Sequence, residues 1–205
     1  MASKVFTFLN PFLSYIDDGR LFRNPFRILY GFFAIVQLLV PVASLVLGIQ
    51  ALIRAGNMFG SSFGLIVLFI VLWLVLAVVS LIGFQIWWDR KDKLASITRE
   101  GDDFIATPVF SHLIQTTGEW LGTWLAVFGF FFALLTTIFS NVDGLFMLIG
   151  ALAPGGLSTL MRTGVIGMVA APVTGFLVIV GSRFLAEQFR ALTSIANNTS
   201  RSSAG

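Results

Sequence analysis

The sequence predicts an all-α integral membrane protein with four transmembrane helices, and three observations support this prediction. The 205 residues are 57% hydrophobic and only 11% charged, whereas about a quarter of the residues in an ordinary soluble domain are charged. Four apolar stretches reach the roughly 20 residues that a helix needs to cross the hydrocarbon core. Lysine and arginine gather at the ends of these stretches. Because backbone polar groups in lipid must be paired within their own segment, runs of this length form helices.

The N-terminal residues 1–25 are predicted to form a cytoplasmic interfacial segment. Aromatic and polar residues alternate between Phe6 and Phe26, which is typical of a short helix in the headgroup layer. A solvated tail is the alternative. Asn10 and Pro11 interrupt the apolar stretch and no small-residue cleavage site follows, so the segment does not resemble a cleavable signal peptide.

Residues 26–97 are predicted to form a first unit of two spans. The first span runs from about residue 27 to residue 49 and contains Gln37 and Pro41. The second runs from about residue 63 to residue 88 and carries no charged residue. A charged stretch follows it directly, which predicts that the second span ends at a membrane surface.

A second unit of two spans is predicted at residues 120–197, after a cytoplasmic connecting segment at residues 98–119. Its first span lies at about 120–139 and its second at about 164–186. The remaining residues, 198–205, are polar and are predicted to be a disordered tail.

One apolar stretch between the third and fourth spans, residues 145–163, fits neither a span nor an open loop. Pro154-Gly155-Gly156 divides it into pieces too short to cross the bilayer twice. It is predicted to lie on the outer interface as a helix, with a re-entrant turn packed against the bundle as the alternative.

The positive charges predict which side of the membrane each end of the chain occupies. Eleven of the 13 lysines and arginines lie before the first span, between the second and third, or after the fourth. The two outer connections hold one each, Arg54 and Arg162. This bias places both termini and the central connection in the cytoplasm. Tryptophans that fit an aromatic belt lie near the same side: Trp87, Trp88, Trp120 and Trp124.

The two units also align with each other as a possible parallel repeat. A shift of 98 residues places Gly31-Phe32-Phe33 on Gly129-Phe130-Phe131 and Gly83 on Gly181. The same shift places Leu94, Ser96 and Ile97 on Leu192, Ser194 and Ile195. Two spans per unit predict a repeat with both halves in the same orientation. Chance agreement in a composition rich in Phe, Gly and Leu is the alternative.

The second unit resembles an uncharacterised family of small bacterial two-span membrane domains. In that family the last span runs into an Arg-x-x-x-Glu helix that ends with Ile followed by Asn, and the matching residues here are Arg183, Glu187, Ile195, Asn197 and Asn198. The stretch "FRILYGFFAIVQLL" is similar to the family's first span. The first unit departs from the pattern, because Gln85 and Asp89 stand where Arg and Glu are expected. The resemblance implies a bacterial inner membrane and a topology, but no activity.

Few residues offer catalytic or metal chemistry. The chain has no cysteine and one histidine, His112, so it cannot supply the two histidines or thiolates that a haem or a catalytic zinc usually needs. His112 falls in the connecting segment, where a solvated or capping role is expected, with contact to a pigment or a quinone as the alternative. No cofactor or metal is predicted, and enzymatic function is not expected. The basic residues form no patch, which argues against nucleic-acid binding.

Polar and small residues at membrane depth are predicted to pack helices together. Amides and hydroxyls there commonly bond neighbouring helices, and small residues allow close approach. Alternatively, some of them line a path for a neutral solute. The candidates are Gln37, Pro41, Thr136, Thr137, Gly164, Gly167 and Gly175.

The chain from Arg183 to Ile195 is predicted to be an amphipathic exit helix that leaves the bilayer along its surface or docks on a partner. Arg183 and Glu187 are spaced by four residues and are predicted to form an interfacial ion pair.

These observations predict a non-enzymatic membrane subunit that packs against other membrane proteins or against copies of itself. Its partners would be membrane lipids and other integral membrane subunits. One alternative is a channel or transporter for a small neutral or lipid-like solute that uses Gln37, Pro41, Thr136 and the Pro154-Gly155-Gly156 turn. A further alternative is a pigment- or quinone-binding subunit that uses His112.

Overall fold

The protein forms four long α-helices, seen in a computed structural model that describes residues 20–54, 63–94, 106–139 and 164–203. The helices are α2 (Arg20–Arg54), α3 (Phe63–Lys93), α4 (Ala106–Ile138) and α7 (Val165–Ser203). Each contains a stretch long and apolar enough to cross a membrane, and the described ranges contain no strand. The predicted all-α fold of a multi-pass membrane protein is confirmed.

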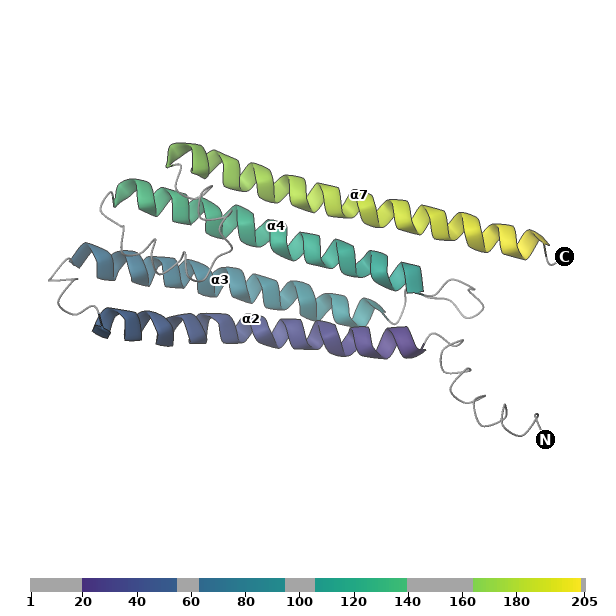
Figure 1. Cartoon of the computed structure of the whole chain (residues 1–205), viewed down its shortest axis with the longest axis horizontal. Coiled ribbons are helices and arrows are strands. Elements are labelled where there is room, and N and C mark those ends of the chain that lie inside the picture. The colour runs from purple at the N-terminus through teal and green to yellow at the C-terminus, as the bar shows by residue number, and fades with distance from the viewer. Residues whose placement is uncertain (1–19, 55–62, 95–105, 140–163, 204–205) are drawn as a thin grey trace, which may run out of the picture.

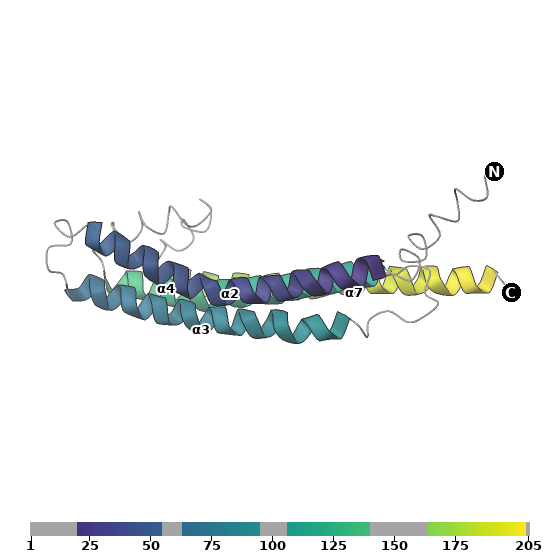
Figure 2. The ribbon, with the colours of Figure 1, turned by 90° about the horizontal axis from the view of Figure 1, so that it is seen from below.

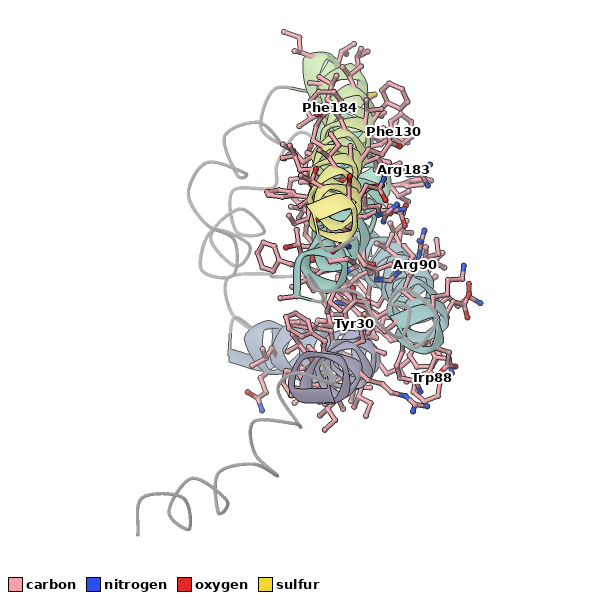
Figure 3. All side chains as sticks on the ribbon, turned by 90° about the vertical axis from the view of Figure 1, so that its right-hand side faces the viewer. Tyr30, Trp88, Arg90, Phe130, Arg183 and Phe184 are labelled. Atoms are coloured by element: carbon pink, nitrogen blue, oxygen red, sulfur yellow. The ribbon has the colours of Figure 1, made fainter. Side chains whose placement is uncertain are left out.

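The helices lie side by side along one common direction (Figures 1 and 2). α4 packs against α7 on one side and α3 on the other, and α2 packs mainly against α3. Seen along the helices, α7 lies at one extreme, and α2 and α3 lie next to each other at the opposite extreme (Figure 3). α7 is therefore held mainly by α4, and the rest of its surface faces outward.

All four helices exceed the thickness of the hydrocarbon core. α7 has 39 residues and is about 58 Å long, against about 30 Å for the core. The excess lies mostly at one end of the molecule, which we call the basic end because it carries these described cations: Arg27, Arg90, Lys91, Lys93, Arg183 and Arg190.

Two helices continue beyond the predicted limits. The predicted exit helix is not a separate surface helix, because α7 runs through Arg183 to Ser203 as one element, and neither Pro nor Gly follows Gly181 in it to break it. α4 begins at Ala106, inside the predicted connecting segment. Pro108 lies in its first turn, where a proline removes no helical hydrogen bond.

Small residues bring the axes of α4 and α7 close together. A Cβ atom added to Gly175 of α7 would lie against the carbonyl oxygen of Gly122 and 2.8 Å from the backbone nitrogen of Ala126. A Cβ atom on Gly118 of α4 would collide with Ser182, which lies about two turns after Gly175 on α7. Glycine at these positions therefore permits direct contact between the two backbones, as in other membrane helix pairs.

The buried apolar side chains form two clusters. One joins α3 and α4 away from the basic end and consists of Leu68, Leu72, Val79, Phe128, Phe132 and Leu135. The other joins α2, α3 and α4 nearer the basic end and consists of Tyr30, Ala34, Trp87, Leu94 and Val109. The second cluster lies beside the polar contacts described below.

The repeat predicted from the sequence agrees with the pairing of neighbours, since α2 packs on α3 and α4 packs on α7. The aligned glycines nevertheless have different surroundings. A Cβ atom on Gly83 would lie 2.9 Å from Gln37 Oε1, whereas one on Gly181 would meet nothing within 4 Å. The internal repeat stays a prediction about the sequence.

Several predicted segments lie outside the described residues. They are the interfacial segment up to residue 19, the outer segment 145–163 with its Pro154-Gly155-Gly156 turn, and the last two residues of the tail. Most of the remaining tail, predicted as disordered, belongs to α7.

The close approach of α4 and α7 predicts unequal effects of two matched substitutions. Gly175→Ala should lower the free energy of unfolding by about 2 kcal/mol, because the added methyl group would force the two backbones apart. Gly181→Ala, on the same helix, should leave it unchanged or raise it, because its Cβ position is open. Unfolding followed by circular dichroism in detergent measures both, and equal effects would contradict the described helix contact.

Candidate functional site

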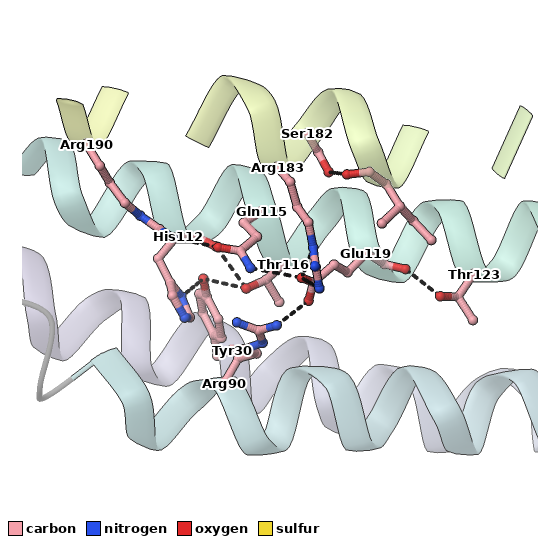
Figure 4. A network of polar contacts seen from close by, with 11 residues as sticks. Tyr30, Arg90, His112, Gln115, Thr116, Glu119, Thr123, Ser182, Arg183 and Arg190 are labelled. Atoms are coloured by element: carbon pink, nitrogen blue, oxygen red, sulfur yellow. Dashed lines mark hydrogen bonds and ion pairs between the residues drawn. The ribbon is translucent and has the colours of Figure 1, made fainter. Parts of the chain in front are cut away.

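A buried carboxylate, Glu119 of α4, joins three helices near the basic end (Figure 4). Arg90 of α3 donates from Nη2 to Glu119 Oε2 at 2.6 Å. Arg183 of α7 donates to Glu119 Oε1 from Nη2 at 2.8 Å and from Nε at 3.0 Å. The Glu119 side chain is only 11% exposed. Both carboxylate oxygens are therefore engaged by cations from the two helices that flank α4.

The position of Glu119 along α4 explains why its charge is paired. About 28 Å of helix separate it from the far end of α4 at Ile138, nearly the whole thickness of a hydrocarbon core. On α7, about 27 Å separate Val165 from Arg183. With the far ends of α4 and α7 placed at the opposite surface of the core, both charges lie at its boundary, where an unpaired carboxylate is costly and a paired, hydrogen-bonded one is tolerated.

Further polar contacts between α4 and α7 continue from Glu119 toward the basic end. Gln115 Nε2 donates to Glu119 Oε1 at 2.9 Å. Arg190 of α7 donates from Nη2 to Gln115 Oε1 at 2.5 Å and from Nε to Ser111 Oγ at 3.0 Å. Ser111, Gln115 and Glu119 are spaced by four residues and share one face of α4, which explains how they meet α7 together.

A second arm of polar contacts joins α4 to α2. The Tyr30 hydroxyl lies 2.9 Å from His112 Nδ1 and also donates to Thr116 Oγ1 at 3.4 Å. Thr116 Oγ1 in turn donates to the His112 carbonyl at 2.8 Å. Tyr30 lies between α2, α3 and α4 in Figure 3 and is fully buried. α2, which does not reach Glu119, is tied to α4 through this contact.

Aromatic rings fill the space beside Tyr30. The Trp87 ring lies edge-on to Tyr30 with centroids 5.0 Å apart, and Trp120 lies 6.1 Å from Trp87. Trp87 Nε1, Trp120 Nε1 and His112 Nε2 are buried without a hydrogen-bond partner within the described part of the chain. Ser80 Oγ shares this property. Buried polar atoms usually bind a partner, so these atoms keep hydrogen-bonding capacity for one.

Two of the predicted packing residues of α2 face α3. Gln37 is buried, and its Oε1 atom lies close to Gly83 of α3. The Pro41 carbonyl accepts hydrogen bonds from Trp73 Nε1 at 2.8 Å and from Ser44 Oγ at 2.9 Å. The Pro41 carbonyl oxygen thus links α2 to Trp73 of α3.

The other predicted packing residues lie on α4 and α7. Thr136 and Thr137 donate their hydroxyls to backbone carbonyls one turn earlier in α4, at 2.9 Å and 2.7 Å. Gly164 adopts a left-handed conformation with φ 58° just before α7, which glycine accommodates without strain. Gly167 is buried and Gly175 contacts α4. These residues are spread along the bundle and do not form one site.

The structure corrects the prediction for His112. The side chain was expected to be solvated or to cap a helix, but it is only 4% exposed and contacts Tyr30. The reason is that α4 begins at Ala106, so His112 lies within the helix and on its packed face.

The structure also corrects the predicted ion pair of Arg183 with Glu187. Arg183 pairs with Glu119, and Glu187 is exposed and forms no ion pair with the described residues. Glu119 was missed because the third span was placed after it, at Trp120. The regular spacing of Ser111, Gln115 and Glu119 is the sequence signal that could have placed it on a helix face.

The contacts of Glu119 join α3 and α7 to α4. A general base needs a carboxylate oxygen that can accept a proton from a substrate, and both oxygens of Glu119 already accept hydrogen bonds from arginine. Among the described residues, no group of three or more His, Asp or Glu side chains could hold a metal ion. Comparisons of the chain with protein-family models, curated proteins and solved structures give no match, so the resemblance to the two-span family stays a prediction.

Two of the ion pairs at the basic end, Arg90–Glu119 and Arg27–Asp92, should have different coupling energies. A double-mutant cycle with Arg90→Met and Glu119→Gln should give a coupling of about 2 kcal/mol, because both side chains are largely buried. The control cycle, Arg27→Met with Asp92→Asn, should give less than about 1 kcal/mol, because this 3.4 Å pair is mostly exposed. Unfolding free energies of the variants in detergent provide both values, and equal couplings would contradict the central role of Glu119.

Burial of His112 predicts resistance to chemical modification. Diethyl pyrocarbonate should not modify the His112 imidazole in the folded protein, because this side chain is buried. The reagent should modify it after unfolding in dodecyl sulfate, and the imidazole signal is unambiguous because His112 is the one histidine in the chain. A variant that combines His112→Gln with Ser194→His provides the positive control, since Ser194 is exposed on α7. Modification of the folded parent protein at the rate of this control would contradict the described position of His112.

Proposed function

We propose that the protein is a non-enzymatic structural or accessory subunit that packs against other integral membrane proteins or against further copies of itself. The observation that carries this proposal is the Glu119 network. The charged groups nearest the hydrocarbon core bind one another across α3, α4 and α7, with 2.6 Å and 2.8 Å contacts. Such an arrangement serves to fix helices in place.

The outer face of α7 supports packing with a neighbour. α7 is held mainly by α4, and large apolar side chains cover the part that faces away. These exposed residues include Val169, Val173, Phe176, Leu177 and Val180. An apolar helix face in a membrane can be covered by lipid or by another helix, and close helix packing uses van der Waals contact of this kind.

The contacts of Thr136, Thr137 and Gln37 argue against a polar path for a solute. A polar path needs hydroxyls that can bond a passing solute. Thr136 and Thr137 donate their hydroxyls to α4's own carbonyls, and Gln37 is buried against α3. Transport of a small neutral solute is therefore the weaker candidate.

The distribution of charge supports a bacterial inner membrane location with both termini in the cytoplasm. The described lysines and arginines of α3, and those of α7, lie at the end of the bundle where α2 begins and α7 ends. The positive-inside rule would place this basic end on the cytoplasmic side.

Photo-crosslinking tests the proposed role. A photoreactive amino acid at Phe176, which is 63% exposed on α7, should give a discrete protein adduct when native membranes are irradiated. The same amino acid at Phe132, which is 1% exposed, should give none. Mass spectrometry of the adduct distinguishes a second copy from another subunit. Lipid adducts alone at Phe176, together with a monomer mass after gentle solubilisation, would overturn the proposal.

A further inference from the structure

A cluster of three arginines from α3 and α7 at the basic end outnumbers the acidic groups that it contacts. Arg90, Arg183 and Arg190 carry three positive charges, and within the described residues the one carboxylate they contact is Glu119. Arg190 contacts the neutral groups Ser111 and Gln115. The cluster therefore keeps an excess of positive charge on the side where α7 meets α4.

Contacts with α4 orient both α7 arginines while leaving part of each guanidinium group free for another ligand. A guanidinium group has five N–H donors. Arg183 uses Nε and Nη2 for Glu119, and Arg190 uses Nε and Nη2 for Ser111 and Gln115. Among the described residues, the Nη1 donors of both arginines bond no partner, and the Arg183 side chain is 55% exposed. An arginine held in this way is pre-organised to bind a planar or tetrahedral oxyanion.

The depth of these arginines matches that of lipid phosphates. Arg183 lies at the boundary of the hydrocarbon core, about 27 Å along α7 from Val165. Arg190 lies about 10 Å further toward the basic end, which is within the headgroup layer. Basic sites between helices at this depth on the cytoplasmic side are suited to anionic headgroups.

The surface of α7 next to Arg183 can accommodate an acyl chain. Val180 and Phe176 lie one and two turns from Arg183 toward the membrane centre on the same face of the helix, and both are exposed. A phosphate at Arg183 would thus have its attached chains beside apolar side chains. A free phosphate ion would gain nothing from this surface.

We propose that Arg183 and Arg190 of α7 bind the headgroup phosphate of an anionic phospholipid. Arg90 contributes by sharing the charge of Glu119 from the α3 side, so that Arg90 and Arg183 together carry one more positive charge than Glu119 balances. Glu187 lies on the same face of α7 between them, is exposed and forms no ion pair with the described residues, so it weakens the attraction. This lipid site goes beyond the proposed subunit role and does not depend on it.

Native mass spectrometry of the full chain in detergent tests the proposal, with titrations of phosphatidylglycerol and of phosphatidylcholine. The parent should bind the first phosphatidylglycerol more tightly than the first phosphatidylcholine. Arg190→Gln should weaken phosphatidylglycerol binding about fivefold, the effect of about 1 kcal/mol per cation near a membrane surface. It should leave phosphatidylcholine binding unchanged. Because Arg190 has only neutral partners in α4, this variant retains the Glu119 ion pairs.

Three further variants separate a specific site from general attraction to a basic surface. Arg183→Gln should weaken phosphatidylglycerol binding by a similar factor, and Glu187→Gln should strengthen it. Arg27→Gln removes the same charge from α2, on the far side of the bundle, and should have no effect. Equal losses for Arg27→Gln and Arg190→Gln, or no gain for Glu187→Gln, would overturn the proposed site.

Competition with soluble phosphate identifies the source of the phosphate. Inorganic phosphate and glycerol phosphate, at the concentrations used for the lipid, should not displace phosphatidylglycerol, because neither covers the apolar face at Phe176 and Val180. Displacement by either at those concentrations would overturn the assignment to a lipid.

Discussion

The fold depends most directly on the need to neutralise a carboxylate at the edge of a hydrocarbon core. Glu119 lies where an unpaired charge is costly, and two arginines from the helices on either side of α4 supply the compensating charge at 2.6 Å and 2.8 Å. Removing either arginine would leave one oxygen of the carboxylate without its arginine partner, so α3 and α7 are both constrained relative to α4. The two ion pairs of Glu119 thus fix the rotation of α3 and α7 relative to α4, while the apolar side chains supply most of the contact area between the helices.

The small residues of α4 and α7 make this ion pair geometrically possible. Gly122 and Gly175 allow the two backbones to touch, which brings the start of the Arg183 side chain within reach of Glu119. On α7 the backbone contact at Gly175 lies about two turns from Arg183, and on α4 Gly122 lies less than one turn from Glu119, so the two contacts support each other. α7 is consequently attached along one strip and exposes its remaining surface, which is the surface that the proposed partner and the proposed lipid would contact.

Polar groups in the bundle divide into two kinds with different structural roles. The hydroxyls of Thr136 and Thr137 bond carbonyls of their own helix and so add little between helices. Tyr30, His112 and the Glu119 network instead bond across helices. The second kind lies toward the basic end, and the first lies at the opposite end of α4, where apolar packing of residues such as Phe132 holds α3 to α4. Apart from the bond of Trp73 to the Pro41 carbonyl, the described polar contacts between helices are therefore concentrated near the basic end.

The sequence alone determined the class of fold, because the need to satisfy backbone groups in lipid makes long apolar stretches into helices wherever they occur. It predicted four spans and the small residue Gly175 as a packing position. It could not determine the partners of Arg183, since a spacing of four residues made Glu187 an equally good local candidate. Only the tertiary structure brought Glu119 into contact with Arg183, which lies 64 positions away in the chain. Only the tertiary structure, likewise, buried His112 against Tyr30. Contacts of this kind depend on which helix faces meet, and that choice is set by packing along the whole length of each helix rather than by any local sequence pattern.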